Sequence, residues 1–217
     1  MAWDDVDGGG LAAVRDLNDL PPDLPRDAVQ ASCGCGDPLA AAAPSPGETV
    51  LDVGCGGGLD VILAAILVGP TGQVYGLDPS ERMLARARAN TAAALGRGRA
   101  SILRGRAEHL PLPSGVVDVV VSNAVWHRIS SHEQACSELA RVCRPGGRIA
   151  FAEIVVADRD PATVRRAHQA LGASVDPLHP PELRAHLAAV GFGHVEITST
   201  AEVAEGVHAA LVTAVRA

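Results

Sequence analysis

The sequence predicts an α/β fold built around a mostly parallel β-sheet. From Glu48 onward, short β-branched runs alternate with helical stretches, a pattern typical of successive βαβ units. The first of these runs leads straight into a cluster of glycines, which permits a tight turn between a strand and its helix. A length of 217 residues suits one domain of this kind.

Strands and helices are distinguished by their apolar patterns. A short apolar run between turn residues predicts a strand, and apolar residues at helical spacing predict a helix. Ser80 is a typical N-cap, and Val116–Ser122 is apolar enough for a strand buried on both faces. The expected order is strand Thr49–Val53, helix Leu59–Val68, strand Gln73–Leu77, a helix after Ser80, strand Ala100–Leu103, strand Val116–Ser122, helix Ser131–Val142, strand Arg148–Val155, a helix between Pro181 and Gly191, and strands Val195–Thr198 and Val207–Val215.

Two parts of the chain are weakly patterned, residues 1–47 and residues 157–180. We expect residues 1–47 to form an N-terminal segment that closes as a lid over the site. Residues 48–217 are expected to form the domain itself. Pro145-Gly146-Gly147 is expected to turn the chain before the fifth strand.

The composition excludes several kinds of function. All 18 positive charges are arginine, which rules out chemistry that needs a lysine, such as a Schiff base or a P-loop. A formal charge of −7 and an aromatic content of 2% argue against nucleic acid and favour a small-molecule partner. Five cysteines without a secretory leader indicate a cytoplasmic protein with reduced thiols. The longest apolar run, Val61–Val68, falls well short of the about 20 residues that span a membrane, so no membrane partner is expected.

The glycine cluster predicts a nucleotide-type cofactor site. Gly54, Gly56 and Gly58 let the backbone approach a ligand, and the helix N-terminus behind them offers unpaired N–H groups. Asp78, at the end of the next strand, is placed to accept the hydroxyls of a ribose. A dinucleotide is excluded because Leu59 stands where the G-x-G-x-x-G/A motif requires a small residue.

These and later motifs resemble the class I S-adenosylmethionine-dependent methyltransferases. The resemblance runs from roughly Cys33 to the C-terminus and implies S-adenosylmethionine as cofactor. It also implies a Rossmann-like, seven-stranded, mostly parallel sheet with helices on both faces and an antiparallel last strand at Val207–Val215. The motifs that carry it, in the order of the family, are Asp52-Val53-Gly54-Cys55-Gly56-Gly57-Gly58, Gly76-Leu77-Asp78-Pro79, Gly105–Pro111, Val119–Asn123 with Trp126-His127, and Arg141–Gly147.

The same resemblance implies roles in cofactor binding. Asp52 would face the methionine end of the cofactor, Asp78 the ribose and Pro79 the adenine. The adenine edge is assigned to Glu108 or to the backbone of Ala107, and the glycine turn passes beneath the cofactor. The implied cofactor-binding residues are Asp52, Gly54, Cys55 through its backbone, Gly56, Gly58, Asp78, Pro79, Ala107, Glu108 and Asn123.

A narrower resemblance is to the arsenite methyltransferases. In that family cysteine thiolates hold a soft As(III) centre. Cys35 matches one of those cysteines and Cys33 is an extra thiol beside it, whereas Ala124 stands where the family has another cysteine. The resemblance therefore implies Cys35 and Cys33 as catalytic ligands of a thiol-bound metalloid. The segments that carry it are Ser32–Pro38, Pro46–Asp52, Val68–Gly72 and Val121–Asn123.

Further candidates concern the methyl acceptor. His127 follows the fourth strand, whose carboxyl end faces the ligand crevice in such sheets, so a general base or a substrate contact is expected there. Glu153 either faces the substrate or closes the sheet, and Trp126 is available to shape an acceptor pocket. Cys136 and Cys143 are expected to be small core residues. No histidine or cysteine spacing typical of a metal site is present.

The acceptor stays open between two classes at this point. One is arsenite or another thiol-bound metalloid, and the other is a natural product that is methylated on oxygen, nitrogen or carbon. A third alternative is a protein of the same fold that binds S-adenosylmethionine without transferring its methyl group, either without catalysis or as an enzyme of a cyclisation or another non-transfer reaction, because the glycines and Asp78 report binding only.

Overall fold

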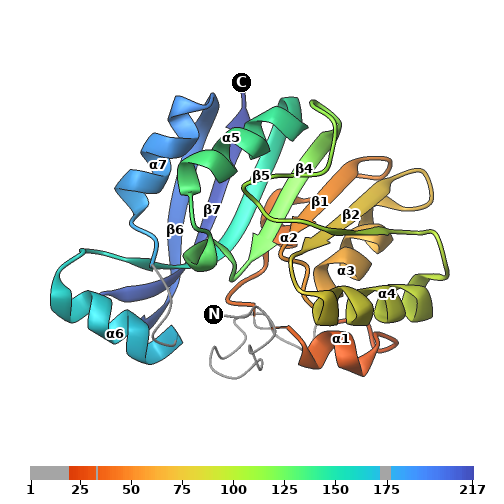
Figure 1. Cartoon of the computed structure of the whole chain (residues 1–217), viewed down its shortest axis with the longest axis horizontal. Coiled ribbons are helices and arrows are strands. Elements are labelled where there is room, and N and C mark those ends of the chain that lie inside the picture. The colour runs from red at the N-terminus through yellow and green to blue at the C-terminus, as the bar shows by residue number, and fades with distance from the viewer. Residues whose placement is uncertain (1–19, 33, 172–176) are drawn as a thin grey trace.

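The structure is a computed structural model that describes residues 20–32, 34–171 and 177–217. Its strands are β1 (Thr49–Val53), β2 (Gln73–Asp78), β3 (Ser101–Arg104), β4 (Val117–Asn123), β5 (Cys143–Val156), β6 (Phe192–Ala204) and β7 (Val207–Arg216). They form one seven-stranded sheet in the order β3-β2-β1-β4-β5-β7-β6 (Figure 1). Strands β1 to β5 are parallel, and β7 runs antiparallel to β5 and β6. The predicted mostly parallel sheet with an antiparallel last strand is confirmed.

Helices cover both faces of this sheet. They are α1 (Arg26–Gln30), α2 (Pro38–Ala42), α3 (Leu59–Val68), α4 (Glu81–Leu95), α5 (His132–Val142), α6 (Pro161–Leu171), α7 (Pro180–Ala189) and the 3₁₀ turn η3 (Trp126–Arg128). On one face Leu139 of α5 and Leu183 of α7 are buried with Phe151 of β5. On the other face Leu39 of α2 and Val61 of α3 are buried in a second core. Sheet residues therefore alternate between two separate apolar layers.

Two helix starts follow the capping chemistry expected of their residues. The Ser80 hydroxyl accepts a hydrogen bond from the Met83 N–H, which confirms Ser80 as the predicted N-cap of α4. Ser131 caps α5 in the same way through the Gln134 N–H. Each cap satisfies one of the backbone donors that a helix start leaves unpaired.

The structure adds three helices in the stretches that the sequence leaves weakly patterned. α1 and α2 lie within residues 1–47, and α6 lies within residues 157–180. Asp37 caps α2 by accepting the Ala40 N–H, with Pro38 in the first turn. Asp160 plays the same part at α6, where its carboxylate accepts the Ala162 N–H. An Asp-Pro pair is typical of a turn as well as of a helix start, so these pairs alone do not predict helices. The apolar pattern that follows them is too weak to decide between the two.

Two strands extend beyond their predicted bounds. β5 begins at Cys143, so the predicted turn Pro145-Gly146-Gly147 falls inside the strand's span. β6 begins at Phe192 rather than at Val195 and continues to Ala204. β6 is the edge of the sheet and its side chains are mostly exposed, so pairing with β7 defines it where an apolar run does not.

The order of strands determines where a ligand can bind. β1 has β2 on one side and β4 on the other, so the chain crosses the sheet in opposite directions from this strand. In open α/β sheets ligands bind at such a switch point, outside the carboxyl ends of the strands. Here those ends are Val53, Asp78 and Asn123. Within the described ranges, the structure contains no helix long and apolar enough to cross a membrane.

Candidate active site

A cleft of about 1050 Å³, including its open mouth, lies at the carboxyl ends of β1, β2 and β4. Its floor is the glycine turn after β1, and its walls come from the ends of β2 and β4 and from the segment that precedes α2. The predicted site residues that line it are Asp52, Gly54, Cys55, Gly56, Asp78, Pro79, Ala107, Glu108 and Asn123. Residues from four separate segments of the chain therefore meet at one cleft.

The glycine turn is shaped by backbone bonds to the neighbouring strand. Gly54 N–H and Cys55 N–H both donate to the Leu77 carbonyl oxygen, at 2.7 and 2.9 Å. Gly54 has a φ of +78°, and a Cβ there would overlap the side chain of Val125. Only glycine meets both conditions, so the turn can pass close beneath a ligand without a side chain in the way.

Asp78 fixes the far side of the same turn. Its Oδ2 accepts the Gly56 N–H at 3.0 Å, and its Oδ1 accepts the Ser80 N–H at 2.9 Å. The carboxylate thus joins the glycine turn to the start of α4 and borders the cleft. An acidic side chain at the end of this second strand is where a ribose is bound in related sheets.

Glu108 and Ala107 form the opposite wall. The Glu108 carboxylate accepts the Ser130 N–H at 2.9 Å and the Ser130 hydroxyl at 2.6 Å. Arg106 lies 3.5 Å from its other oxygen. Burial acts to raise the pKa of Glu108, but the Ser130 bonds, its own backbone N–H and the charge of Arg106 together outweigh it, so the pKa lies below its usual value. Glu108 is therefore a charged wall residue that ties this loop to the segment after β4.

The segment before α2 covers one side of the cleft. Ala28, Ala31, Ser32 and Gly34 line it, and Asn123 holds the following residues in place. The Asn123 Oδ1 accepts the Cys35 N–H at 2.9 Å. Its Nδ2 donates to the carbonyl oxygen of residue 36 at 3.0 Å. Gly34 approaches the same amide so closely that a Cβ would lie 2.6 Å from Nδ2.

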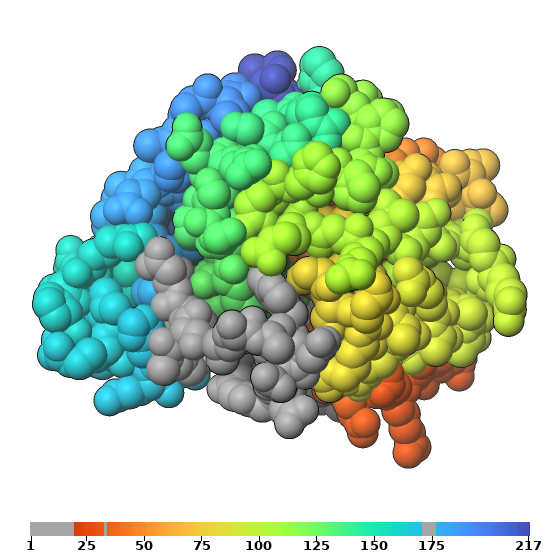
Figure 2. Space-filling model, viewed as in Figure 1, coloured from red at the N-terminus to blue at the C-terminus, as the bar shows by residue number. Residues whose placement is uncertain are grey.

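A polar cluster attaches α1 to the body of the domain. The Asp27 carboxylate accepts from Arg86 of α4 at 2.7 Å and from the Asn90 Nδ2 at 2.9 Å. The same Asn90 amide donates to the Gly57 carbonyl oxygen at 2.9 Å. Figure 2 shows the N-terminal residues, in red and orange, against α4, in yellow, at the lower edge of this face. Through the Asn90 amide, the cluster links α1 to the glycine turn.

Cys35 lies beside the cleft rather than in its lining. Its side chain is 1% exposed, and Sγ is 3.9 Å from the Asn123 Oδ1. Burial raises the pKa of the thiol, and the carboxylate of Glu153 raises it further. The thiol is therefore protonated at neutral pH in this arrangement. Cys33, its predicted companion, lies outside the described residues.

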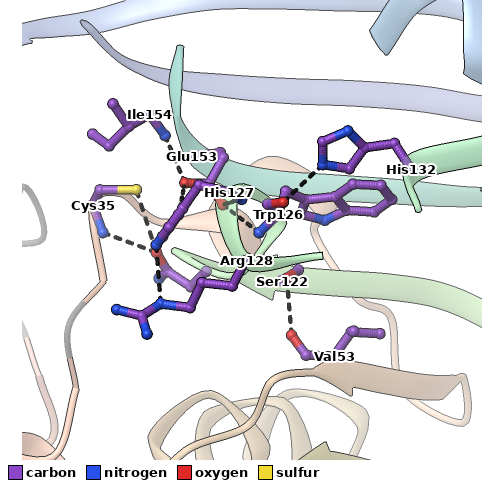
Figure 3. Close-up of polar contacts among 10 residues, drawn as sticks. Cys35, Val53, Ser122, Trp126, His127, Arg128, His132, Glu153 and Ile154 are labelled. Carbon is purple, nitrogen blue, oxygen red and sulfur yellow. Dashed lines mark hydrogen bonds and ion pairs between the residues drawn. The ribbon is translucent and has the colours of Figure 1, made fainter. Parts of the chain in front are cut away.

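His127 belongs to a buried polar chain behind the cleft (Figure 3). Its ring is 4% exposed, and Nδ1 lies 2.7 Å from the Glu153 Oε1. The Arg128 Nε donates to the His127 Nε2 at 3.1 Å. An Nε2 that accepts has no proton, so Nδ1 carries the hydrogen and donates it to Glu153. A base role for His127 stays a prediction, and it requires Arg128 to release Nε2.

Some predicted residues take other positions. Gly58 does not line the cleft; it starts α3 with a φ of +86°, and a Cβ there would lie 3.2 Å from the Ala87 Cα. This close packing against Ala87 of α4 favours glycine, and a cofactor contact by Gly58 stays a prediction. Trp126 is fully buried and packs on Phe151 at 4.5 Å between ring centroids, so it does not shape the cleft. Glu153 neither faces the cleft nor merely closes the sheet, because it holds His127.

The remaining cysteines behave as core residues. Cys136 and Cys143 are buried among apolar side chains, as predicted. Burial raises the pKa of the Cys136 thiol to about 12 and that of Cys143 to about 11. Cys55 borders the cleft with its thiol buried, and burial raises its pKa too. Among the described residues, no group of three or more histidine, cysteine or acidic side chains is arranged to hold a metal ion.

Arg128 and Asp60 are charged residues of the lining that were not among the predicted site residues. Arg128 follows His127 directly, lies at the end of η3 and lines the cleft. Asp60, on the first turn of α3, lines the cleft and accepts from the Asn123 Nδ2 at 3.3 Å. Asp60 could have been noticed from the sequence, because it is an acid in the first turn of a helix, where the helix dipole favours negative charge. No such feature marks Arg128.

Comparison with known proteins gives a consistent picture. Residues 51–151 match a family model described as a methyltransferase domain. The arsenite methyltransferase of Halobacterium salinarum is 38% identical over 185 residues, which cover 82% of this chain and 46% of that protein. Nocamycin O-methyltransferase of Saccharothrix syringae is 35% identical over 160 residues, which cover 69% of this chain and 55% of that protein. The chain thus spans about half the length of these curated relatives.

Solved structures agree with the sequence relatives. An arsenic(III) S-adenosylmethionine methyltransferase from Chlamydomonas reinhardtii superimposes with a TM-score of 0.71 at 27% identity. The superposition covers 89% of this chain and 70% of that one. The shared region thus includes nearly every element described above.

Proposed function

Because this chain belongs to the S-adenosylmethionine-dependent methyltransferases, we propose that it transfers the methyl group of S-adenosylmethionine to a small-molecule acceptor. The observation that supports the proposal most directly is the cleft at the switch point of the sheet. It combines a glycine turn that has no room for a Cβ at Gly54 or Gly57, the carboxylate of Asp78 and the wall of Ala107 and Glu108.

The residues present fit the cofactor. Gly54 and Gly57 leave a cradle that side chains would fill, since a Cβ at Gly57 would lie 2.5 Å from the Ala31 Cβ. Asp78 would accept the ribose hydroxyls, and Asp52 would meet the cationic amino group. When bound, S-adenosylmethionine supplies an electrophilic methyl group on a sulfonium. The chain's own contribution is alignment of the acceptor, which can account for several kcal/mol of the barrier.

We propose arsenite, or another thiol-bound metalloid, as the first candidate acceptor. Similarity to arsenite methyltransferases over 82% of this chain and the position of Cys35 beside the cleft support it. Metalloid binding would displace the proton of the Cys35 thiol, because the thiolate is the ligand form. Cys33 is the proposed second ligand.

Cys35→Ser is the variant that tests this acceptor. With labelled S-adenosylmethionine, arsenite and glutathione, methyl transfer to arsenic should fall at least about tenfold, because a hydroxyl is a poor ligand for a soft centre. Cys136→Ser is the matched control, since Cys136 is equally buried and lies on α5 away from the cleft. Equal turnover by the two variants would reject Cys35 as a ligand.

A natural-product acceptor is the second candidate, and a specific observation favours it. Ala124 lines the cleft at the position where a further cysteine would be needed for a three-thiolate site. Similarity to nocamycin O-methyltransferase over 69% of this chain adds support. The same labelled assay with hydroxyl, amine and carbon acceptors separates the candidates. If no acceptor yields S-adenosylhomocysteine although the cofactor binds, the chain is a binding protein of this fold.

We further propose that residues 1–47 act as a lid, with α1 as the part that contacts the cofactor. Ala28 and Ala31 line the cleft, so a bound ligand should stabilise their position. Tryptic cleavage after Arg26 should slow when S-adenosylmethionine is added, whereas cleavage after the exposed and remote Arg97 should not. Equal rates at Arg26 with and without cofactor would contradict the lid.

A further inference from the structure

Arg128 is a cation without an acidic partner in an acidic cleft. Four carboxylates line the cleft, those of Asp52, Asp60, Asp78 and Glu108, against two arginines. Arg106 lies beside Glu108, at 3.5 Å. Within residues 20–32, 34–171 and 177–217, Arg128 forms no ion pair, and its one hydrogen bond goes to the neutral His127 ring. Among the charged side chains of the described cleft lining, this guanidinium is the one that would attract an anion without an acid beside it.

The guanidinium is also fixed in orientation. Glu153, with 0% exposure, accepts the His127 Nδ1–H at 2.7 Å and the Ile154 N–H at 2.8 Å. This holds the His127 Nε2 lone pair in a set direction, and Arg128 donates its Nε–H to it. In Figure 3 the two terminal nitrogens of Arg128 make no contact with the other residues drawn and extend away from His127. They are the edge of the guanidinium fork that suits a carboxylate.

We propose that Arg128 is an anion-binding residue of the cleft that takes a carboxylate group, with His127 and Glu153 as positioning residues. This inference rests on the proposed function, since it concerns the same cleft. The carboxylate belongs either to the amino-acid end of the cofactor or to an acidic group on the methyl acceptor. Both present the same planar pair of oxygens to the fork.

Arg128→Gln distinguishes the sources by calorimetry. S-adenosylhomocysteine carries the cofactor's carboxylate, and 5′-methylthioadenosine lacks it. If the cofactor is the source, the variant should bind S-adenosylhomocysteine about 10- to 100-fold more weakly, the usual loss for a hydrogen-bonded charge, with 5′-methylthioadenosine unchanged. If the acceptor is the source, S-adenosylhomocysteine and 5′-methylthioadenosine both bind as before, and acetate binding to the S-adenosylhomocysteine complex is lost while acetamide is unaffected.

Arg97→Gln is the control for loss of one positive charge, because Arg97 is exposed and outside the cleft. The proposal is overturned if Arg128→Gln matches Arg97→Gln for S-adenosylhomocysteine and for acetate alike. If the unchanged protein fails to bind S-adenosylhomocysteine at all, the proposed function falls. Acetate binding to the protein alone then still decides the part played by Arg128.

The positioning role has its own readout. His127→Ala should lower the preference for the carboxylate-bearing ligand over its neutral counterpart, because Arg128 loses its anchor. His127→Gln should restore part of that preference, since its amide oxygen can accept from the Arg128 Nε. General damage to the cleft would weaken both ligands equally and leave the ratio unchanged. An unchanged ratio in His127→Ala therefore rejects His127 as a positioning residue.

Discussion

Gly54→Ala is expected to weaken S-adenosylmethionine binding by at least about 100-fold, equivalent to about 2.7 kcal/mol, while the chain stays folded. The new Cβ would overlap the side chain of Val125, which lines the same cleft. Either Val125 moves into the space of the cofactor or the turn moves away from it. Both outcomes damage the cradle directly. Calorimetric titration with S-adenosylmethionine and thermal unfolding of the same sample measure the two effects.

Gly69→Ala is the matched control. Gly69 has a φ of +66°, close to the +78° of Gly54, but a Cβ there would have nothing within 4 Å. Both variants place an alanine at a positive φ, and Gly69, with a ψ of −167°, lies in a region nearly confined to glycine, so the control carries backbone strain of about 1–3 kcal/mol. Only Gly54 borders the cleft, so only Gly54→Ala should lose cofactor affinity. Equal affinity in the two variants would show that the Gly54 backbone does not shape the site.

The sheet could be predicted because its strands are buried. Val117–Asn123 is covered on both faces, and such a strand stands out as an apolar run. The edge strand β6 alternates exposed and half-buried residues, so only a short part of it was recognised. The helices α1 and α2 were missed because each has only five residues and too few turns for a periodic pattern.

The candidate site could be predicted in part for a related reason. Residues at strand ends, such as Asp78 and Asn123, converge on one edge of a parallel sheet whatever surrounds them. Side-chain environment is different, because it depends on segments that fold back from elsewhere. Nothing in the sequence shows that Cys35 is covered by the sheet, or that Trp126 packs inward on Phe151. Glu153 contacts His127, which lies 26 positions earlier in the chain, and His127 in turn holds its neighbour Arg128. No sequence pattern indicates this pairing.

Glu153→Ala is expected to lower the free energy of unfolding by about 3 kcal/mol or more, because three buried donors lose their acceptor at a cost of about 1–3 kcal/mol each. The carboxylate accepts the Trp126 N–H at 2.5 Å, the Ile154 N–H at 2.8 Å and the His127 Nδ1–H at 2.7 Å. Alanine would leave these donors buried without an acceptor. Urea unfolding at pH 7 measures the loss. Glu202→Ala, an exposed glutamate on β6, is the control and should stay within about 0.5 kcal/mol of the parent.

Glu153→Gln shows how much of that stability depends on charge. Burial acts to raise the pKa of Glu153, but His127 and the backbone N–H donors outweigh it, so the pKa lies below its usual value. A carboxylate with a lowered pKa stabilises the folded state above the unfolded pKa of about 4.3, and this contribution is lost as the pH falls through the folded pKa. The parent should therefore be more stable than Glu153→Gln at pH 7, and the difference should shrink on acidification. A difference that is constant from pH 7 down to pH 3 would mean that Glu153 acts through its shape and not through its charge.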